Sequence, residues 1–237
     1  MLIRCLRIDM LKMKRLPILY AHIVIPILIS AVFLAYYKIC GWNEYEKVSA
    51  FYQALGIGFP VLIGIFTANQ MELEQSAGEY QNILTVKHKI TVFISKVIIL
   101  NIYSFVSLFL TTMIFSVGMS ISGFANIFRS CLTSAALIWL AGIPLYIWQM
   151  MIAFHFGKGA SIGVGILGGL VSALMLTGLG DIGWKYIPVA WTARFPSVYL
   201  MGEYEGIMLL HFTIVIFVSI LYYVLWASRW EGRIISE

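Results

Sequence analysis

Six long apolar runs constrain this sequence more than any other feature. Each is about 20 residues long, the length that an α-helix needs to cross the hydrocarbon core of a bilayer. The composition agrees, because 61% of the 237 residues are hydrophobic and only 11% are charged. A water-soluble domain of this size carries far more charge. The sequence therefore predicts one all-α membrane domain, residues 1–237, with six transmembrane helices at about 16–37, 49–71, 93–118, 130–154, 160–180 and 207–227.

Lysine and arginine are distributed unequally between the segments that connect these runs. With the amino terminus in the cytoplasm, eleven of the sixteen basic residues lie inside and five outside, which the positive-inside rule favours. An even number of spans then places both termini in the cytoplasm. The eleven are Arg4, Arg7, Lys12, Lys14, Arg15, Lys87, Lys89, Lys96, Lys158, Arg229 and Arg233, and the five are Lys38, Lys47, Arg129, Lys185 and Arg194.

Residues 1–15 combine basic side chains with apolar residues at helical spacing. The apolar positions Leu2, Leu6, Met10 and Met13 predict a short helix that lies in the cytoplasmic headgroup layer. A plain basic flank that only sets the topology is the alternative. The apolar run that follows is too long for a signal peptide and lacks a small-x-small cleavage site, so we expect it to be retained as the first span.

The one long polar interruption of the chain is residues 72–89, and this topology predicts a cytoplasmic segment over 72–92. Leu73, Ala77, Tyr80 and Leu84 are spaced by four, three and four residues and form one apolar stripe. Such a short amphipathic helix can lie at the membrane or enter a groove on a partner. Gly78 weakens it by about 1 kcal/mol relative to alanine, so a bend or break is expected there. A solvated linker is the alternative.

Residues 160–180 carry small side chains at intervals of four. A face of this kind lets another helix approach closely. Packing within the chain is the first interpretation, and contact with a second membrane chain is the alternative. The residues are Ser161, Gly165, Gly169 and Ala173.

The outer segment 181–206 is dense in aromatic residues. Rings at the boundary of a span favour the headgroup layer, so the segment is expected to dip into the outer leaflet as short or re-entrant helices. Five of its rings are candidates for contact with an amphiphilic substrate, and anchoring alone is the alternative. They are Trp184, Tyr186, Trp191, Phe195 and Tyr199, with Tyr204 a further aromatic of the segment.

The sequence lacks the motifs of several classes of protein. Gly157-Lys158 has Ile152 where a phosphate loop requires its first glycine, so any ATP must be bound by another subunit. The four histidines lack metal-ligand spacing, and the three cysteines form no Cys-x-x-Cys pair. No acidic residue lies in the middle of a predicted span, which argues against ion-coupled transport. No catalytic group converges at helical spacing, so the chain is not expected to be an enzyme.

One run in the polar interruption carries a family resemblance. Glu72-x-Glu-x-x-x-Gly-Glu-Tyr-x-x-x-Leu-Thr, followed by Lys87, Lys89 and Lys96, resembles the cytoplasmic segment of ABC-2 type permeases. It is similar in particular to the small six-span permeases of lantibiotic-immunity ABC transporters. The resemblance covers essentially the whole chain through its length, span count and aromatic outer segment.

The resemblance implies a type V exporter fold in a bacterial cell membrane, with a cytoplasmic coupling helix and outer re-entrant helices between spans five and six. It implies a complex of two ATPase subunits with this chain and a second, related permease. The partner ATPase would bind ATP and Mg²⁺, and this chain no cofactor, metal or nucleic acid. The substrate would be a lantibiotic peptide expelled from the membrane for self-protection. The ATPase-coupling residues would be Glu72, Glu74, Gly78, Glu79, Tyr80, Leu84, Lys87 and Lys89.

Two other functions stay open at this point. A bacitracin-type or general drug exporter would share the architecture. A non-transporting membrane sensor or regulator would also share it, but would not associate stably with an ATPase.

Overall fold

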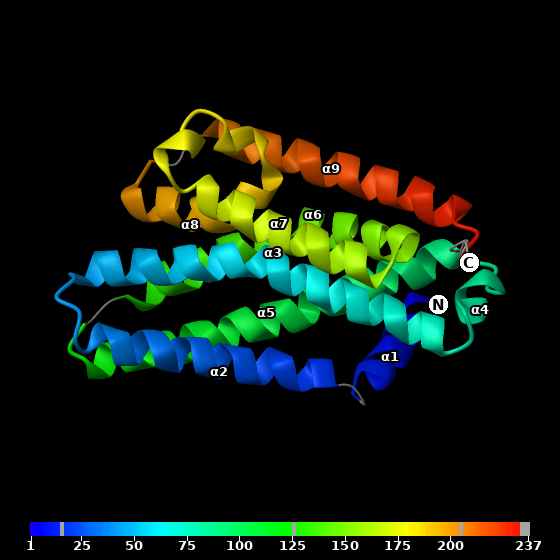
Figure 1. Ribbon diagram of the computed structural model, residues 1–237, viewed down its shortest axis with the longest axis horizontal. Coiled ribbons are helices and arrows are strands. Elements are labelled where there is room, and N and C mark those ends of the chain that lie inside the picture. The colour runs from blue at the N-terminus through cyan, green and yellow to red at the C-terminus, as the bar shows by residue number, and fades with distance from the viewer. Residues whose placement is uncertain (15–16, 125–126, 204–205, 233–237) are drawn as a thin grey trace.

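The chain forms an elongated bundle of helices that run along one common axis (Figure 1). The structure is a computed structural model that describes residues 1–14, 17–124, 127–203 and 206–232. Over these ranges it contains α-helices and short 3-10 helices and no strand. Arg15, Tyr204 and Arg233, which entered the sequence predictions above, lie outside the described residues.

Five helices are long and apolar enough to cross a membrane, in the part of the chain that the structure describes. The run predicted at 160–180 forms a shorter helix, α7, of 17 residues. At 1.5 Å per residue it is about 25 Å long, against a hydrocarbon core of about 30 Å. The all-helical membrane fold is therefore supported with five candidate spans, and the count of six stays a prediction. The five are α2 (Pro17–Tyr37), α3 (Glu44–Ser76), α5 (Lys89–Ile121), α6 (Phe128–Phe156) and α9 (Gly206–Arg229), and α7 is Lys158–Leu174.

The helix α3 extends well beyond its predicted span of 49–71. Its first turn is fixed by a capping box, in which the Glu46 amide donates to Asn43 Oδ1 and the Asn43 amide donates to Glu46 Oε2, both at 2.9 Å. Two otherwise unpaired amides at the start of the helix are satisfied in this way. At its other end α3 continues to Ser76, so Glu72 and Glu74 belong to the helix and not to a loop.

The helix α7 packs against α3 within the chain, through small residues on both helices. A Cβ atom added to Gly165 would lie 3.0 Å from both Gly64 Cα and the Pro60 carbonyl oxygen. Ser161 donates to the Gly64 carbonyl at 2.9 Å and shares a second hydrogen bond with Thr67. Of the four small residues singled out in the sequence, Ser161, Gly165 and Gly169 meet α3 in this way, and Ala173 is half-buried.

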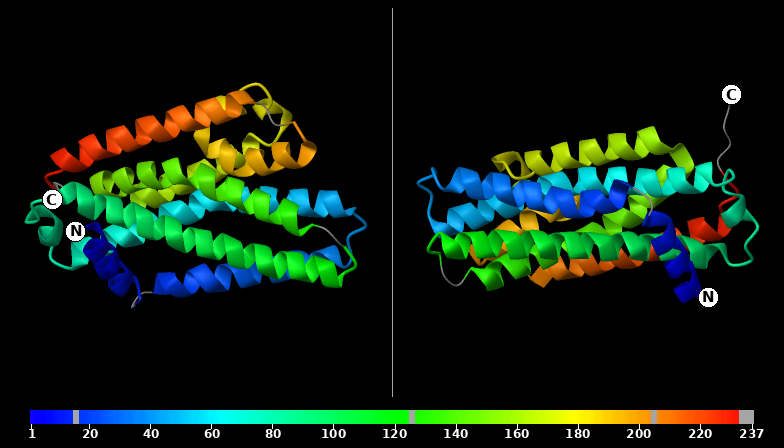
Figure 2. Two further views of the ribbon diagram at one scale, coloured as in Figure 1. Left: turned by 180° about the vertical axis from the view of Figure 1, so that it is seen from behind. Right: turned by 90° about the horizontal axis from the view of Figure 1, so that it is seen from below.

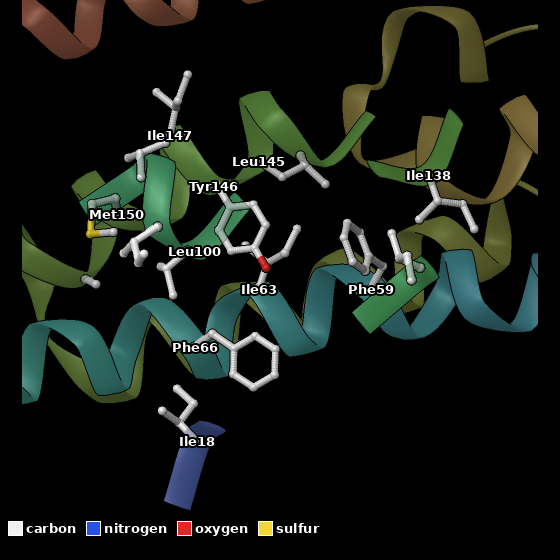
Figure 3. Packing of buried hydrophobic residues seen from close by; sticks show 14 of the residues in the cluster. Ile18, Phe59, Ile63, Phe66, Leu100, Ile138, Leu145, Tyr146, Ile147 and Met150 are labelled. Atoms are coloured by element: carbon white, nitrogen blue, oxygen red, sulfur yellow. The ribbon is translucent and has the colours of Figure 1, made fainter. Parts of the chain in front are cut away.

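The core lies where α3, α5 and α6 meet. Figure 3 shows Tyr146 of α6 among Ile63 and Phe66 of α3 and Leu100 of α5. All four side chains are buried. Burial of large apolar side chains between helices is what holds these three spans together.

The chain from Gly178 to Met201 folds into three 3-10 turns and one α-helix, and the first turn precedes the predicted outer segment 181–206. The turns are η1 (Gly178–Gly180), η2 (Trp184–Tyr186) and η3 (Pro188–Ala190), and the helix is α8 (Trp191–Met201). The α8 helix lies against α3, where the Thr192 hydroxyl donates to the Gly56 carbonyl at 2.8 Å. Short helices are present here as predicted, and their re-entrant depth in a membrane stays a prediction.

One end of the bundle gathers α1 (Leu2–Met13), the single-turn α4 (Gln81–Leu84) and the end of α9 (Figure 1). The α1 helix crosses the long axis and projects to the side of the bundle (Figure 2). Its predicted lipid face was wrong in part, because Met13 is buried against the protein and Leu6 is half-buried. The reason is Asp9, which faces inward and turns the helix toward a lysine of α5.

Candidate coupling site

The connection between α3 and α5 is a tight left-handed turn. Gly78, Glu79 and Tyr80 have φ angles of 114°, 48° and 68°. The Glu79 amide donates to the Gln75 carbonyl at 2.8 Å and the Tyr80 amide to the Glu74 carbonyl at 3.2 Å, which satisfies the last carbonyls of α3. The break expected at Gly78 is therefore present. The single amphipathic helix predicted over Leu73–Leu84 was wrong, because the chain divides there into the end of α3 and the single turn of α4.

Tyr80 anchors this turn to the rest of the bundle. Its ring is 3% exposed and meets the ring of Trp230 edge to face, with 5.4 Å between the centroids. Its hydroxyl donates to Met71 Sδ at 2.9 Å. Two left-handed residues other than glycine cost about 1–2 kcal/mol each. Burial of a large ring contributes about 1.5–3 kcal/mol and offsets most of that cost.

The predicted coupling residues divide into exposed and buried sets. Glu72, Gly78, Glu79 and Lys87 are exposed, and Leu84 and Lys89 are half-buried. Glu74 and Tyr80 are buried, so their predicted contact with a partner is corrected to a role inside the chain. The exposed residues around the turn form one polar surface, called the coupling surface below: Gly78, Glu79, Gln81, Asn82, Lys87 and His88.

Two contacts tie the ends of α3 and α5, on either side of the coupling surface, to neighbouring helices. Lys89 Nζ donates to the Trp230 carbonyl at 3.2 Å, which ties the start of α5 to the end of α9. Glu72 pairs with Lys158 of α7 at 2.7 Å, and both side chains are 49% exposed. An exposed pair of this kind contributes about 1 kcal/mol or less. The turn is therefore held mainly by Tyr80 and by the buried charges below it.

Below the turn lies a cluster of four charged side chains, three of them buried and the fourth, Lys12, 29% exposed. Lys96 Nζ lies 2.6 Å from Glu74 Oε1 and 3.0 Å from Asp9 Oδ1. Lys12 Nζ lies 2.7 Å from the same Glu74 oxygen, and Ser95 donates to the other Asp9 oxygen. The Lys96 side chain is completely buried. The charge cluster, Asp9, Lys12, Glu74 and Lys96, therefore joins α1, α3 and α5 at the base of the coupling surface.

Three of these four residues were not among the predicted site residues. Two features of the sequence could have pointed to them. Asp9 is the one acid among five basic residues, and Lys96 is a charged residue in an apolar run. Isolated charges beside a membrane segment usually have a partner. Their pairing was not readable, because Asp9 and Lys96 are 87 positions apart.

The outer aromatic residues mostly form a core and do not face outward. Trp184, Trp191 and Phe195 are buried and pack with Met208 of α9. Trp191 and Phe195 are stacked, with 5.5 Å between their centroids. The predicted contact of these three rings with a substrate is therefore corrected, because α8 folds back onto α6 and α9. Tyr186 is 70% exposed, and Tyr199 is half-buried.

The ranges that the structure covers contain no group of three or more His, Cys, Asp or Glu residues placed to hold a metal ion.

Comparison with known proteins identifies the family. A family model described as ABC-2 family transporter protein matches residues 5–172, which is 168 of the 237 residues. The chain belongs to the ABC-2 transporter family. The match runs from α1 through most of α7 and includes the coupling surface and the charge cluster. A search of curated proteins gave no match.

Membership has three consequences for this ABC-2 permease. It is a multi-pass membrane protein with a role in transport. The family domain is a membrane component and not a catalytic one. An ABC-2 permease works with an ABC ATPase. The outer segment 181–206 and all of α9 lie beyond the matched residues.

Proposed function

We propose that this chain is the permease subunit of an ATP-driven exporter that expels lantibiotic peptide from a bacterial cell membrane and so protects the producer. The observation that carries the proposal is the coupling surface. It is polar and exposed, and Tyr80 and the charge cluster hold it at the end of two 33-residue spans. A rigid, water-facing surface in a membrane protein suits a docking site for the ATPase that the family requires.

The proposed mechanism is a transfer of force from the ATPase to the spans. When the ATPases close on ATP, they press on the coupling surface. The ends of α3 and α5 move together, because Glu74 and Lys96 join them. The ATPase drives this change only if it contacts the coupling surface differently in its open and closed states.

The proposed topology places the coupling surface and both termini in the cytoplasm, with residues 1–237 as one domain. The positive-inside rule supports it. So does the grouping of the predicted inner segments at one end, where Glu72 meets Lys158 and Tyr80 meets Trp230. In this topology α7 is the fifth span and the outer segment enters the outer leaflet. The complex would contain two ATPase subunits, which bind ATP and Mg²⁺, and a second, related permease.

The lantibiotic substrate rests on the resemblance of residues 72–96 and of the overall layout to lantibiotic-immunity permeases. Burial of Trp184, Trp191 and Phe195 restricts the proposed substrate contacts in the outer segment. Tyr186 is the most exposed of the five candidate rings, and its edge meets His211 at 5.2 Å between centroids. We therefore place the outer peptide contact at Tyr186.

Co-purification tests the coupling surface. Glu79→Lys reverses an exposed charge of the coupling surface, and it is expected to reduce recovery of the neighbouring ATPase and survival under lantibiotic. Glu203→Lys makes the same change on an exposed residue at the opposite end of the bundle, and it is expected to retain both. Normal ATPase recovery and full protection with Glu79→Lys would refute the assignment.

Survival assays separate the possible substrates. Cells that express the permease and its ATPase are expected to survive lantibiotic better than bacitracin or unrelated drugs. Equal protection against bacitracin would favour a general drug exporter. A permease that never co-purifies with an ATPase would favour the sensor or regulator.

A further inference from the structure

The exposed face of α1 combines apolar and basic side chains. Ile3 and Leu11 are 82% and 57% exposed, and Arg7 and Lys14 lie on the same face. The one acid of the helix, Asp9, faces inward and is paired. A helix face that offers hydrophobic and cationic groups without an acid is complementary to an anionic lipid surface.

A cavity lies between α1 and the turn that links α4 to α5. Its volume is about 720 Å³. The α1 side contributes the basic Arg4 and Lys12 beside the apolar Ile8, and the opposite side is mostly apolar and includes Ile83, Val86 and Val92. Asp9, Glu74 and Lys96 of the charge cluster also line it. The cavity thus presents cationic groups and an apolar surface to the same occupant.

The charges of the cavity are not all compensated within the chain. Glu74 is engaged by Lys12 and Lys96, and Asp9 by Lys96 and Ser95. Arg4 has no carboxylate within ion-pair distance among residues 1–14, 17–124, 127–203 and 206–232. Arg4 is exposed and is one of the residues that line the cavity. A guanidinium binds phosphate through two parallel hydrogen bonds, which suits it to a phosphate ligand.

We propose that this cavity binds the headgroup of an anionic phospholipid, with its phosphate at Arg4 and its glycerol and first methylenes along Val86 and Val92. The apolar wall distinguishes such an amphiphile from free phosphate, which gains nothing from it. The inference uses the orientation given under the proposed function, in which this end of the bundle meets the cytoplasmic leaflet, the leaflet richer in anionic lipid.

The position of the ligand couples it to the spans. Lys12 lines the cavity and also pairs with Glu74 at the end of α3. A bound headgroup would therefore contact α1 and the start of α5 together and hold them in one arrangement below the coupling surface.

Lipid binding by the full-length chain in neutral detergent tests the proposal. Native mass spectrometry would measure binding of short-chain phosphatidylglycerol, of phosphatidylcholine with the same chains, and of inorganic phosphate. The wild-type chain is expected to prefer phosphatidylglycerol. Arg4→Gln is expected to weaken it about fivefold, as loss of one basic residue near an anionic surface does. Arg7→Gln is the matched control, because Arg7 has the same charge on the same helix and does not line the cavity.

A second variant probes the space and not the charge. Ile8→Trp adds bulk on the cavity wall from an exposed position of α1, and it is expected to weaken phosphatidylglycerol without changing the fold. Equal weakening by Arg4→Gln and Arg7→Gln would refute a built site and leave only surface attraction. Phosphate binding that depends on Arg4 as strongly as lipid binding would refute the lipid as ligand. The assay contains neither ATPase nor peptide, so its failure is distinct from failure of the exporter proposal.

Discussion

Replacing Lys96 by methionine is expected to destabilise the permease more than loss of any other single charge in the cluster. The side chain is fully buried and compensates both Asp9 and Glu74, at 3.0 and 2.6 Å. Methionine keeps much of the length and removes the charge. Glu74 retains Lys12, but Asp9 is left with only the Ser95 hydroxyl. Loss of one partner from a buried pair costs about 3–5 kcal/mol, because the remaining charge stays buried without compensation.

A thermal unfolding assay of the purified permease in detergent measures this cost. For a chain of this size, 1 kcal/mol corresponds to about 2–4 °C in the midpoint, so Lys96→Met is expected to lower it by about 6–20 °C. Lys158→Met removes an exposed charge with a single partner, and it should lower the free energy of unfolding by at most about 1 kcal/mol. The double variant Asp9→Leu/Lys96→Met should recover much of the loss, since apolar residues replace a buried pair at little cost. Equal shifts for Lys96→Met and Lys158→Met would refute the buried cluster.

Three further substitutions, two of them with a comparison variant, test the packing and the turn. Gly165→Val places a side chain against Gly64 and Pro60 and should cost about 1–3 kcal/mol by overpacking. Gly163→Val, on the same helix with nothing within 4 Å of its Cβ, should cost less in the same thermal assay. Trp191→Ala removes a side chain that is 1% exposed and should lower the free energy of unfolding by about 3–5 kcal/mol. Tyr186→Ala should leave stability unchanged and reduce only protection against peptide. Tyr80→Ala removes the anchor of the coupling turn and should raise amide hydrogen exchange over residues 77–88.

Each of these expectations has an opposing result. A Gly163→Val variant as unstable as Gly165→Val would show that the cost comes from the β-branched side chain and not from close packing of α7 on α3. Full stability in Trp191→Ala would mean that the outer aromatic cluster is not a core. Unchanged exchange in Tyr80→Ala would mean that the turn is held without its ring.

The spans could be predicted from the sequence because membrane burial leaves a local signal. A run of apolar residues long enough for a bilayer is visible without knowledge of its neighbours. The close packing of Gly165 was also locally readable, since small residues at intervals of four favour a helix contact. Its partner, Gly64 on α3, lies 101 positions away and was not readable.

Burial inside the protein was the part that the sequence did not predict. Glu74 stands in the most polar stretch of the chain and yet is buried, because its partner Lys96 comes from another helix, α5. Trp184 and Trp191 are of the residue type that favours the membrane–water interface, and yet they form a core, because α8 folds back onto the bundle. Interfacial and core aromatic residues are the same residue types, and only the tertiary fold separates them.

The two backbone contacts of α3 decide which parts of the molecule can move. A Cβ added to Gly56 would overlap the Thr192 carbonyl of α8, and one added to Gly64 would lie 2.7 Å from the Ser161 carbonyl of α7. Each contact brings the backbone of α3 against that of one neighbour, so neither α8 nor α7 can slide past α3 without breaking its contact. We therefore expect α3, α7 and α8 to move as one rigid body. Its length is about 50 Å, which is the length of the α3 helix at 1.5 Å per residue. The helices α2 and α9 are the two spans least enclosed by the protein, so they are the ones free to move relative to this rigid body. A pathway that opens during transport would therefore open between the rigid body and α2 or between the rigid body and α9.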